Sequence, residues 1–225
     1  FIREYKIDTV LIQGSVMNPG TYKVNRGTTL SELIKSAGGY ESSAYPFGGY
    51  LENKKALEIN KVSKERLYDA FITNIITNGM SSSSQDTNSG QLLLQLKESK
   101  STGRIIAEFD LNIIKNDPSE DTILEDGDRL LIPQMTQQVF IQGEVGNTGA
   151  IRYVPNETID YYVNKSGGYL KSADQDNIFI IHPNGETENL NTNTRLSFIM
   201  SDSDKKLIYP GSIIFIPQKT NFASS

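Results

Sequence analysis

Few side chains in this sequence have the types and spacing that catalysis or metal binding requires. The single histidine, His182, precedes Pro183 at an Asn-Gly turn, and no motif supplies it with a nucleophile and an orienting acid. With one histidine and no cysteine, a zinc site would rest on carboxylates, which are not the usual zinc ligands. We therefore interpret His182 as a surface-turn residue, and we predict no enzymatic activity, no cofactor and no metal site.

Acidic and glycine-rich segments offer two further chemical possibilities. An acidic run that could collect Ca²⁺ comprises Asp117, Glu120, Asp121, Glu125, Asp126 and Asp128. It lacks the spacing of an EF-hand loop, and a solvated loop is the preferred interpretation. Gly38-Gly39 and Gly48-Gly49 are not followed by the lysine and helix start of a phosphate-binding loop, so we interpret them as a helix stop and a turn.

Tyrosines are the candidates for ligand contact. A tyrosine presents a flat ring and a hydroxyl group, and both suit contact with a sugar. The candidate glycan-contact residues are Tyr40, Tyr45, Tyr50 and Tyr169. Phe47 lies in the same aromatic stretch as the first three. Ordinary core packing is the alternative explanation, and it is preferred for most of this set.

These candidates lie in a sequence that occurs twice. Val10-Leu-Ile-Gln-Gly-Ser-Val-Met-Asn-Pro-Gly20 returns 129 residues later as Val139-Phe-Ile-Gln-Gly-Glu-Val-Gly-Asn-Thr-Gly149. Over the 35 positions from Val10 to Ala44, 13 are identical in the second copy, without a gap. The closing segments Asp126–Gln134 and Pro210–Gln218 also correspond. One folding unit used twice explains this spacing, and it points to a scaffold or binding protein.

Each copy predicts the same order of elements. A strand (9–12 or 138–141), a turn and a second strand (21–24 or 150–154) form a hairpin. A short helix follows, with Thr29 and Glu32 in capping-box spacing in the first copy, and a Gly-Gly pair ends it. Further strands are predicted at 48–50, 56–59 and 129–132 in the first copy, and at 178–181, 186–190 and 213–216 in the second. One helix across a small mixed sheet is an α+β, ubiquitin-like (β-grasp) fold.

The first copy carries an insertion at about residues 61–105. Its predicted parts are a helix from Ser63 to Asn78, a polar loop at 81–90, a short helix with Leu92, Leu93 and Leu96, and a strand over 103–109. A local cap on its own domain is the preferred interpretation, and contact with a neighbour is the alternative. We thus predict two domains, residues 1–135 with the insertion and residues 136–225.

The amino-acid composition limits which binding partners are expected for the chain. A net charge of −5 argues against nucleic acid, which requires clustered Lys and Arg. No stretch approaches the ~20 apolar residues of a membrane span. The chain opens on Phe1 in mid-pattern, so we expect it to be a piece of a longer protein, and one that does not itself span a membrane.

The ordered motifs resemble a known family. The segment from Val10 to Gly20 and Ala37-Gly-Gly-Tyr40 resemble the soluble-ligand-binding β-grasp (SLBB) domain. The closing segments that end in Ile132-Pro133 and Ile216-Pro217 resemble outer-membrane polysaccharide export (Wza-type) proteins, which carry such domains in tandem.

The resemblance implies a periplasmic, ring-forming protein that builds or gates a conduit for capsule polysaccharide or exopolysaccharide across the outer membrane. The partners it implies are the polysaccharide, further copies of the same protein and an inner-membrane polysaccharide co-polymerase. The alternative is a β-grasp module that binds a soluble ligand or glycan without transport. A glycan-cleaving enzyme would need a close carboxylate pair in a cleft, and nothing in the sequence favours one.

Overall fold

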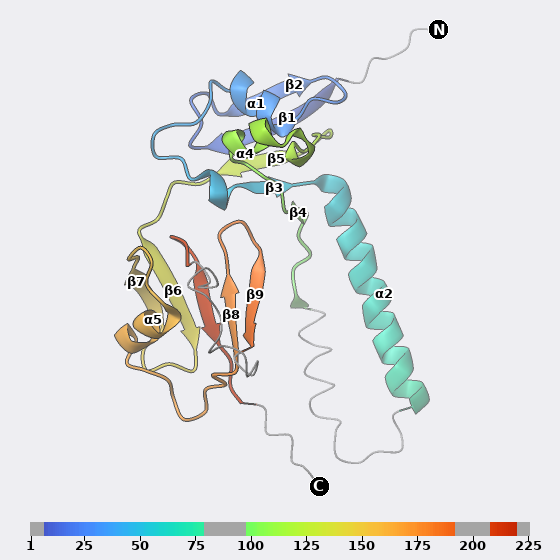
Figure 1. Cartoon of the computed structure of the whole chain (residues 1–225). Coiled ribbons are helices and arrows are strands. Elements are labelled where there is room, and N and C mark those ends of the chain that lie inside the picture. The colour runs from blue at the N-terminus through green and yellow to red at the C-terminus, as the bar shows by residue number, and fades with distance from the viewer. Residues whose placement is uncertain (1–6, 79–97, 192–207, 220–225) are drawn as a thin grey trace.

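The computed structural model describes residues 7–78, 98–191 and 208–219 (Figure 1). The described strands form two five-stranded sheets, one in each copy of the repeat. The first sheet contains β1 (Asp8–Gly14), β2 (Gly20–Val24), β3 (Tyr50–Glu52), β4 (Arg104–Ile105) and β5 (Arg129–Ile132). The second contains β6 (Gln138–Gly143), β7 (Gly149–Arg152), β8 (Asn177–Ile181), β9 (Thr187–Asn191) and β10 (Ile213–Ile216).

The two sheets share one topology. Their strand orders are β2-β1-β5-β3-β4 and β7-β6-β10-β8-β9. The central pairs β1·β5 and β6·β10 are parallel, and all other pairs are antiparallel. This is the mixed sheet of a β-grasp fold, so the predicted fold class is confirmed. The predicted superposition of the two copies follows, because Leu11 pairs with Arg129 as Phe140 pairs with Ile213.

Each sheet is covered by a short helix, α1 (Leu30–Ser36) or α5 (Ile159–Lys165). Alternate strand residues point at this helix, and each unit buries its own core. The innermost strand residues, each at most 1% exposed, are Val10, Ile12, Leu51, Leu130, Ile132, Val139, Ile141, Ile180, Ile214 and Ile216. From the helices, Leu33 and Tyr162 are the equivalent residues that fill these cores.

The helix starts agree with the sequence. Thr29 accepts the backbone N–H of Glu32, and the Glu32 carboxylate accepts the backbone N–H of Thr29, which completes the predicted capping box. In the second copy Thr158 accepts the N–H of Tyr161, and no carboxylate completes the box. Position 161 is therefore freed from the capping role that Glu32 performs.

A glycine ends the first strand of each unit for a steric reason. Gly14 and Gly143 have φ angles of +87° and +93°, the left-handed region that favours glycine. A Cβ atom at these positions would lie 2.0 Å from the Ile132 carbonyl oxygen and 1.9 Å from that of Ile216. The glycine thus permits the chain to bend while it stays bonded to the parallel strand.

Two strand predictions in the first copy were wrong. Residues 56–59 are not a strand but the beginning of α2 (Lys54–Asn78), which starts nine residues before the predicted Ser63. The side chain of Asn53 accepts the N–H of Ala56 at 2.8 Å and caps this helix, so a local hydrogen bond decides against a strand. Of the strand predicted over 103–109, only β4 (Arg104–Ile105) forms, and the strand expected at 48–50 is β3, two residues later.

The rest of the first copy contains three short helices within the described residues. They are η1 (Pro46–Gly48), α4 (Leu111–Asn116) and η2 (Pro118–Glu120). Helix α2 extends away from the first sheet in Figure 1, and Ile59, Val62 and Leu67 on it are 64%, 44% and 56% exposed. The described part of α2 therefore does not form the expected apolar cap on its own domain. The polar loop 81–90 and the helix expected at Leu92–Leu96 lie outside the described residues.

Candidate functional site

Tyr40 and Tyr169 occupy the same position in the two copies and differ in their hydrogen bonds. The Tyr40 hydroxyl donates to the Phe109 carbonyl at 2.6 Å, and burial, helped by the nearby Asp110 and Glu108, raises the pKa of Tyr40. The Tyr169 hydroxyl donates to the Asp160 carboxylate at 3.2 Å, and burial, with that carboxylate, raises the pKa of Tyr169 to about 12. Both hydroxyl protons are thus engaged within the protein.

Tyr169 also lines a groove of about 330 Å³ in the second copy. Asp160 and Asp176 lie in the same wall, with Ile178 and Leu190. Two carboxylates make this groove unfavourable for an acidic ligand.

Tyr45 and Tyr50 lie near the contact between the two units. Tyr45 is 7% exposed, and its hydroxyl has no hydrogen-bond partner within the described residues. Burial, with the neighbouring hydroxyls of Tyr153 and Tyr209, raises the pKa of Tyr45 to about 12. The Arg104 guanidinium lies 4.9 Å from the centre of the Tyr50 ring. The four tyrosines named from the sequence therefore do not converge on one site, and their contact with glycan stays a prediction.

His182 is not a surface residue, so the surface-turn interpretation was wrong. It is 4% exposed, and its ring packs against Tyr209 (5.5 Å between ring centres) and against Phe47 of the other unit (6.4 Å). Its Nδ1 atom lies 3.4 Å from the Ser212 hydroxyl, and its Nε2 atom lies 3.5 Å from a Glu188 carboxylate oxygen. The local turn gave no sign of this burial because Phe47 arrives from 135 positions away in the sequence.

The same contact joins the two units. Phe47 and Tyr209 pack with ring centres 4.4 Å apart, and Arg104 Nη2 donates to the Pro183 carbonyl at 2.8 Å. We call this set of Phe47, Arg104, His182, Pro183 and Tyr209 the junction. Sequence analysis missed it because its members belong to no common motif.

Three carboxylates of the acidic run accept hydrogen bonds from distant or neighbouring parts of the fold, so the run is not a free loop. Asp121 accepts from the N–H and hydroxyl of Ser31, and Asp126 accepts from the N–H of Thr9. Asp128 is 2% exposed and accepts from Asn53 and from the N–H of Glu125, and burial raises its pKa. Within the described ranges, no three His, Cys, Asp or Glu side chains are grouped so as to hold a metal ion.

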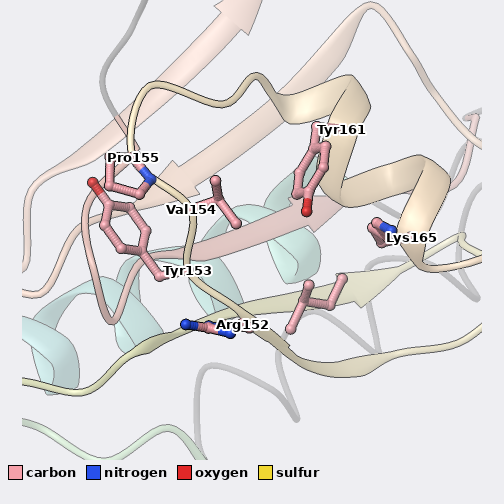
Figure 2. Close-up of a pocket in the computed structure, with 7 residues that line it drawn as sticks. Arg152, Tyr153, Val154, Pro155, Tyr161 and Lys165 are labelled. Atoms are coloured by element: carbon pink, nitrogen blue, oxygen red, sulfur yellow. The ribbon is translucent and has the colours of Figure 1, made fainter.

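A more promising groove lies between the end of β7 and helix α5 (Figure 2). Its volume is about 470 Å³, and its polar lining consists of Arg152, Tyr153, Tyr161 and Lys165. The hydrophobic part of the lining comes from Ile151, Val154 and Pro155. We call it the cationic groove. Its volume lies within the usual range of small-ligand sites.

The first copy has a groove of about 470 Å³ at the corresponding place, between β2 and α1. Its chemistry differs at the equivalent positions, which pair as Lys23 with Arg152, Val24 with Tyr153, Glu32 with Tyr161, and Ser36 with Lys165. The fold thus forms the groove twice. The first groove is lined by Tyr22, Lys23, Lys35 and the Glu32 carboxylate, whereas the second has two tyrosines, two cations and no carboxylate. An alignment of the two copies could have revealed this difference, because these positions are among those where the copies do not match.

The repeated unit is similar to a known kind of domain, the SLBB domain. The family model of the SLBB domain matches residues 9–53 and 138–189, one segment in each sheet. The chain is also homologous to the polysialic acid transport protein KpsD of Escherichia coli, two sequences of which are 29% identical to it over 113 residues. The resemblance to polysaccharide export proteins with SLBB domains is thereby confirmed.

The match covers 48% of this chain and 20% of the relative, so the chain spans about a fifth of the length of the curated protein it matches. No helix in the described part of the chain is long and apolar enough to cross a lipid bilayer.

Proposed function

We propose that this chain is a periplasmic part of a polysaccharide export protein, in which two SLBB domains (residues 1–135 and 136–225) form or gate an oligomeric conduit at the outer membrane. Its cargo is capsule polysaccharide or exopolysaccharide. The observation that carries the proposal is the tandem SLBB arrangement together with homology to a polysaccharide transport protein. The work is assembly and guidance of a glycan, and it requires no bond to be made or broken.

The junction supports a mechanical part of this proposal. A ring of identical subunits requires every protomer to hold its two domains at one angle, because closed symmetry repeats a single interface. Here the connection from β5 to β6 is only residues 133–137, too short for wide separation. Phe47, Tyr209 and the Arg104–Pro183 hydrogen bond then fix the angle that the short connection allows.

Self-association and contact with an inner-membrane polysaccharide co-polymerase complete the proposal. Helix α2 is the longest described element of the first copy that has no counterpart among the described residues of the second, and it exposes Ile59, Val62 and Leu67. These exposed apolar side chains offer a contact for a neighbouring protein.

The test loosens the junction in the full-length protein and measures polysaccharide export. A long Gly/Ser segment inserted after Gln137, or Phe47→Asp, which installs the residue found at the equivalent position 176, should leave both domains folded and abolish export. The same segment inserted after Ser119, in the exposed stretch 115–120, is the control and should preserve export. Undiminished export after the Gln137 insertion would overturn rigid coupling as part of the mechanism.

The alternative function, a module that binds a soluble ligand or glycan without transport, is favoured by the cationic groove alone. It predicts saturable binding by a single chain and export that does not depend on the angle between the domains.

A further inference from the structure

We infer that the cationic groove of the second copy binds an acidic sugar, with Arg152 and Lys165 on its carboxylate and Tyr153 and Tyr161 against its ring. The inference deepens the proposed function and rests on it for the class of ligand, a polysaccharide. It assigns the contact to one of the two copies and to one kind of glycan.

Charge is the first argument. The chain has a net charge of −5, yet no carboxylate lines this groove and two cations do. Neither Arg152 nor Lys165 has a carboxylate partner among the described residues. Arg152 is exposed at the end of β7, and a guanidinium presents paired N–H donors that match the two oxygens of a carboxylate.

The aromatic rings are the second argument. Figure 2 shows Tyr153 and Tyr161 on opposite sides of Val154, with Arg152 nearer the former and Lys165 nearer the latter. Tyr161 and Lys165 are four residues apart on α5 and therefore on one face of the helix, and the Lys165 ammonium lies 5.7 Å from the centre of the Tyr161 ring. A sugar seated here would meet ring faces at its C–H groups and cations at its acidic group.

The groove is also preformed. The Tyr162 side chain is fully buried, and its hydroxyl donates to the Val154 carbonyl at 3.0 Å and accepts the Val154 N–H at 3.1 Å. The N–H of Tyr153 donates to the Gln137 carbonyl at 2.8 Å. These bonds fix the segment after β7 against the helix, so a ligand does not have to order the wall that it contacts.

The groove of the first copy differs from the cationic groove in ways that disfavour an acidic sugar. There Glu32 replaces Tyr161, and its carboxylate is held in the capping box at the N–H of Thr29. Ser36 replaces Lys165. The first groove keeps two cations, Lys23 and Lys35, but an acidic sugar there would lose one aromatic surface and meet the Glu32 carboxylate, so binding should favour the second copy.

The experiment uses the 225-residue chain with two acidic sugars and two controls. Trigalacturonate and a trimer of sialic acid are the acidic sugars, maltotriose is a neutral sugar of the same length, and triglutamate carries carboxylates without a sugar ring. Calorimetry gives the affinity, and NMR shifts of backbone amides at 150–165 and at 21–36 report which groove is occupied. We expect at least one acidic trimer to bind at 150–165 about tenfold more tightly than maltotriose and triglutamate, and to weaken with salt.

Variants that exchange the chemistry of the two grooves sharpen the test. Tyr161→Glu with Lys165→Ser installs the residues of the first copy, and it should weaken binding of the acidic trimer about tenfold or more. The matched control, Lys23→Ala with Ser36→Ala in the first copy, should leave the affinity unchanged. Unfolding curves of each variant establish that the second unit remains folded.

Several results would overturn the inference. They are equal binding of maltotriose, equal binding of triglutamate, shifts at 21–36 instead of 150–165, or no saturable binding of either acidic trimer. If binding is absent while the Gln137 insertion still abolishes export, only this inference fails. If the acidic trimer binds as expected while the insertion leaves export intact, the proposed function fails and the site remains.

Discussion

The two copies of the repeat agree in their interiors and differ on their surfaces. Both sheets have the same strand order, the same parallel central pair and a glycine at the same bend. Even isolated pairings recur, since Val16 bridges Tyr40 as Val145 bridges Tyr169. The first copy adds α2, and the second adds the cationic groove. The fold is therefore maintained by a small set of backbone requirements, while the faces outside that set are free to take on separate tasks.

The largest loss of stability should come from substitution of the glycine that ends the first strand of each copy. Gly143→Ala and Gly14→Ala each place a Cβ within about 2 Å of a carbonyl oxygen on the parallel strand, at a positive φ. We expect either to lower the free energy of unfolding by about 3 kcal/mol or more. Urea unfolding, followed by tyrosine fluorescence, measures the loss.

A glycine of the same conformation without the clash is the control. Gly168 has a φ of +82°, and nothing lies within 4 Å of the position that a Cβ atom would take there. Gly168→Ala should cost only about 1 kcal/mol, the strain of the left-handed region. If it costs as much as Gly143→Ala, contact with the parallel strand is not the reason for the bend that the copies share.

The next largest loss of stability is expected at a core position where the two copies differ. Tyr162 and Leu33 are equivalent and both fully buried, but only Tyr162 bonds the backbone of the next segment. Tyr162→Phe leaves the N–H and C=O of Val154 without that partner, so we expect a loss of about 1–3 kcal/mol in the free energy of unfolding. Leu33→Met in the first copy, a change of similar volume, should cost less than about 1.5 kcal/mol. A loss below about 0.5 kcal/mol in Tyr162→Phe would show that the hydroxyl contributes little.

Alkaline pH should weaken both copies. Folding raises the pKa of Tyr45 and of Tyr169 from the ordinary value of 10.0 to about 12, mainly through burial. Above pH 10 the unfolded chain releases protons that the folded chain retains, so the free energy of unfolding falls as the pH rises from about 10 to about 12, and is unaffected well below 10. Urea midpoints across this range measure the slope. Tyr45→Phe and Tyr169→Phe should each reduce it, and an unchanged slope in both variants would contradict the assignment.

The smallest effect is expected at Tyr45. Its buried hydroxyl has no partner within the described residues, so Tyr45→Phe removes an unsatisfied group and should change the free energy of unfolding at neutral pH by less than about 0.5 kcal/mol, or raise it. Tyr40→Phe is the contrast, because it removes the bond to the Phe109 carbonyl and should cost about 1 kcal/mol. A large loss at Tyr45 would mean that its hydroxyl is bonded after all.

The sequence was sufficient for what the copies share. Alternating apolar residues, the Thr29–Glu32 capping box and the glycine pairs each act over a few residues, so they predicted the strands, the helices and the β-grasp fold. It was insufficient where distant segments meet. The burial of His182 depends on Phe47, and the start of α2 depends on Asn53, whose amide is held by Asp128.

The candidate functional residues show the same limit of sequence analysis. Tyr40, Tyr45, Tyr50 and Tyr169 were chosen by residue type, and the structure distributes them over separate places. The cationic groove was not chosen, because Arg152 and Tyr153 precede α5 while Tyr161 and Lys165 lie on it, and only the packing of α5 against the end of β7 brings them together.

The insertion in the first copy also has a kinetic consequence. The parallel pair Leu11 and Arg129 is 118 positions apart, whereas Phe140 and Ile213 are 73 apart. During synthesis on the ribosome, at about 5–20 residues per second, β5 is made about 6–24 s after β1. The first sheet can therefore close before β10 has been made. In refolding from denaturant the whole chain is present at once, and the shorter loop closes about twofold faster. We therefore expect the order in which the two sheets form to reverse between synthesis and refolding.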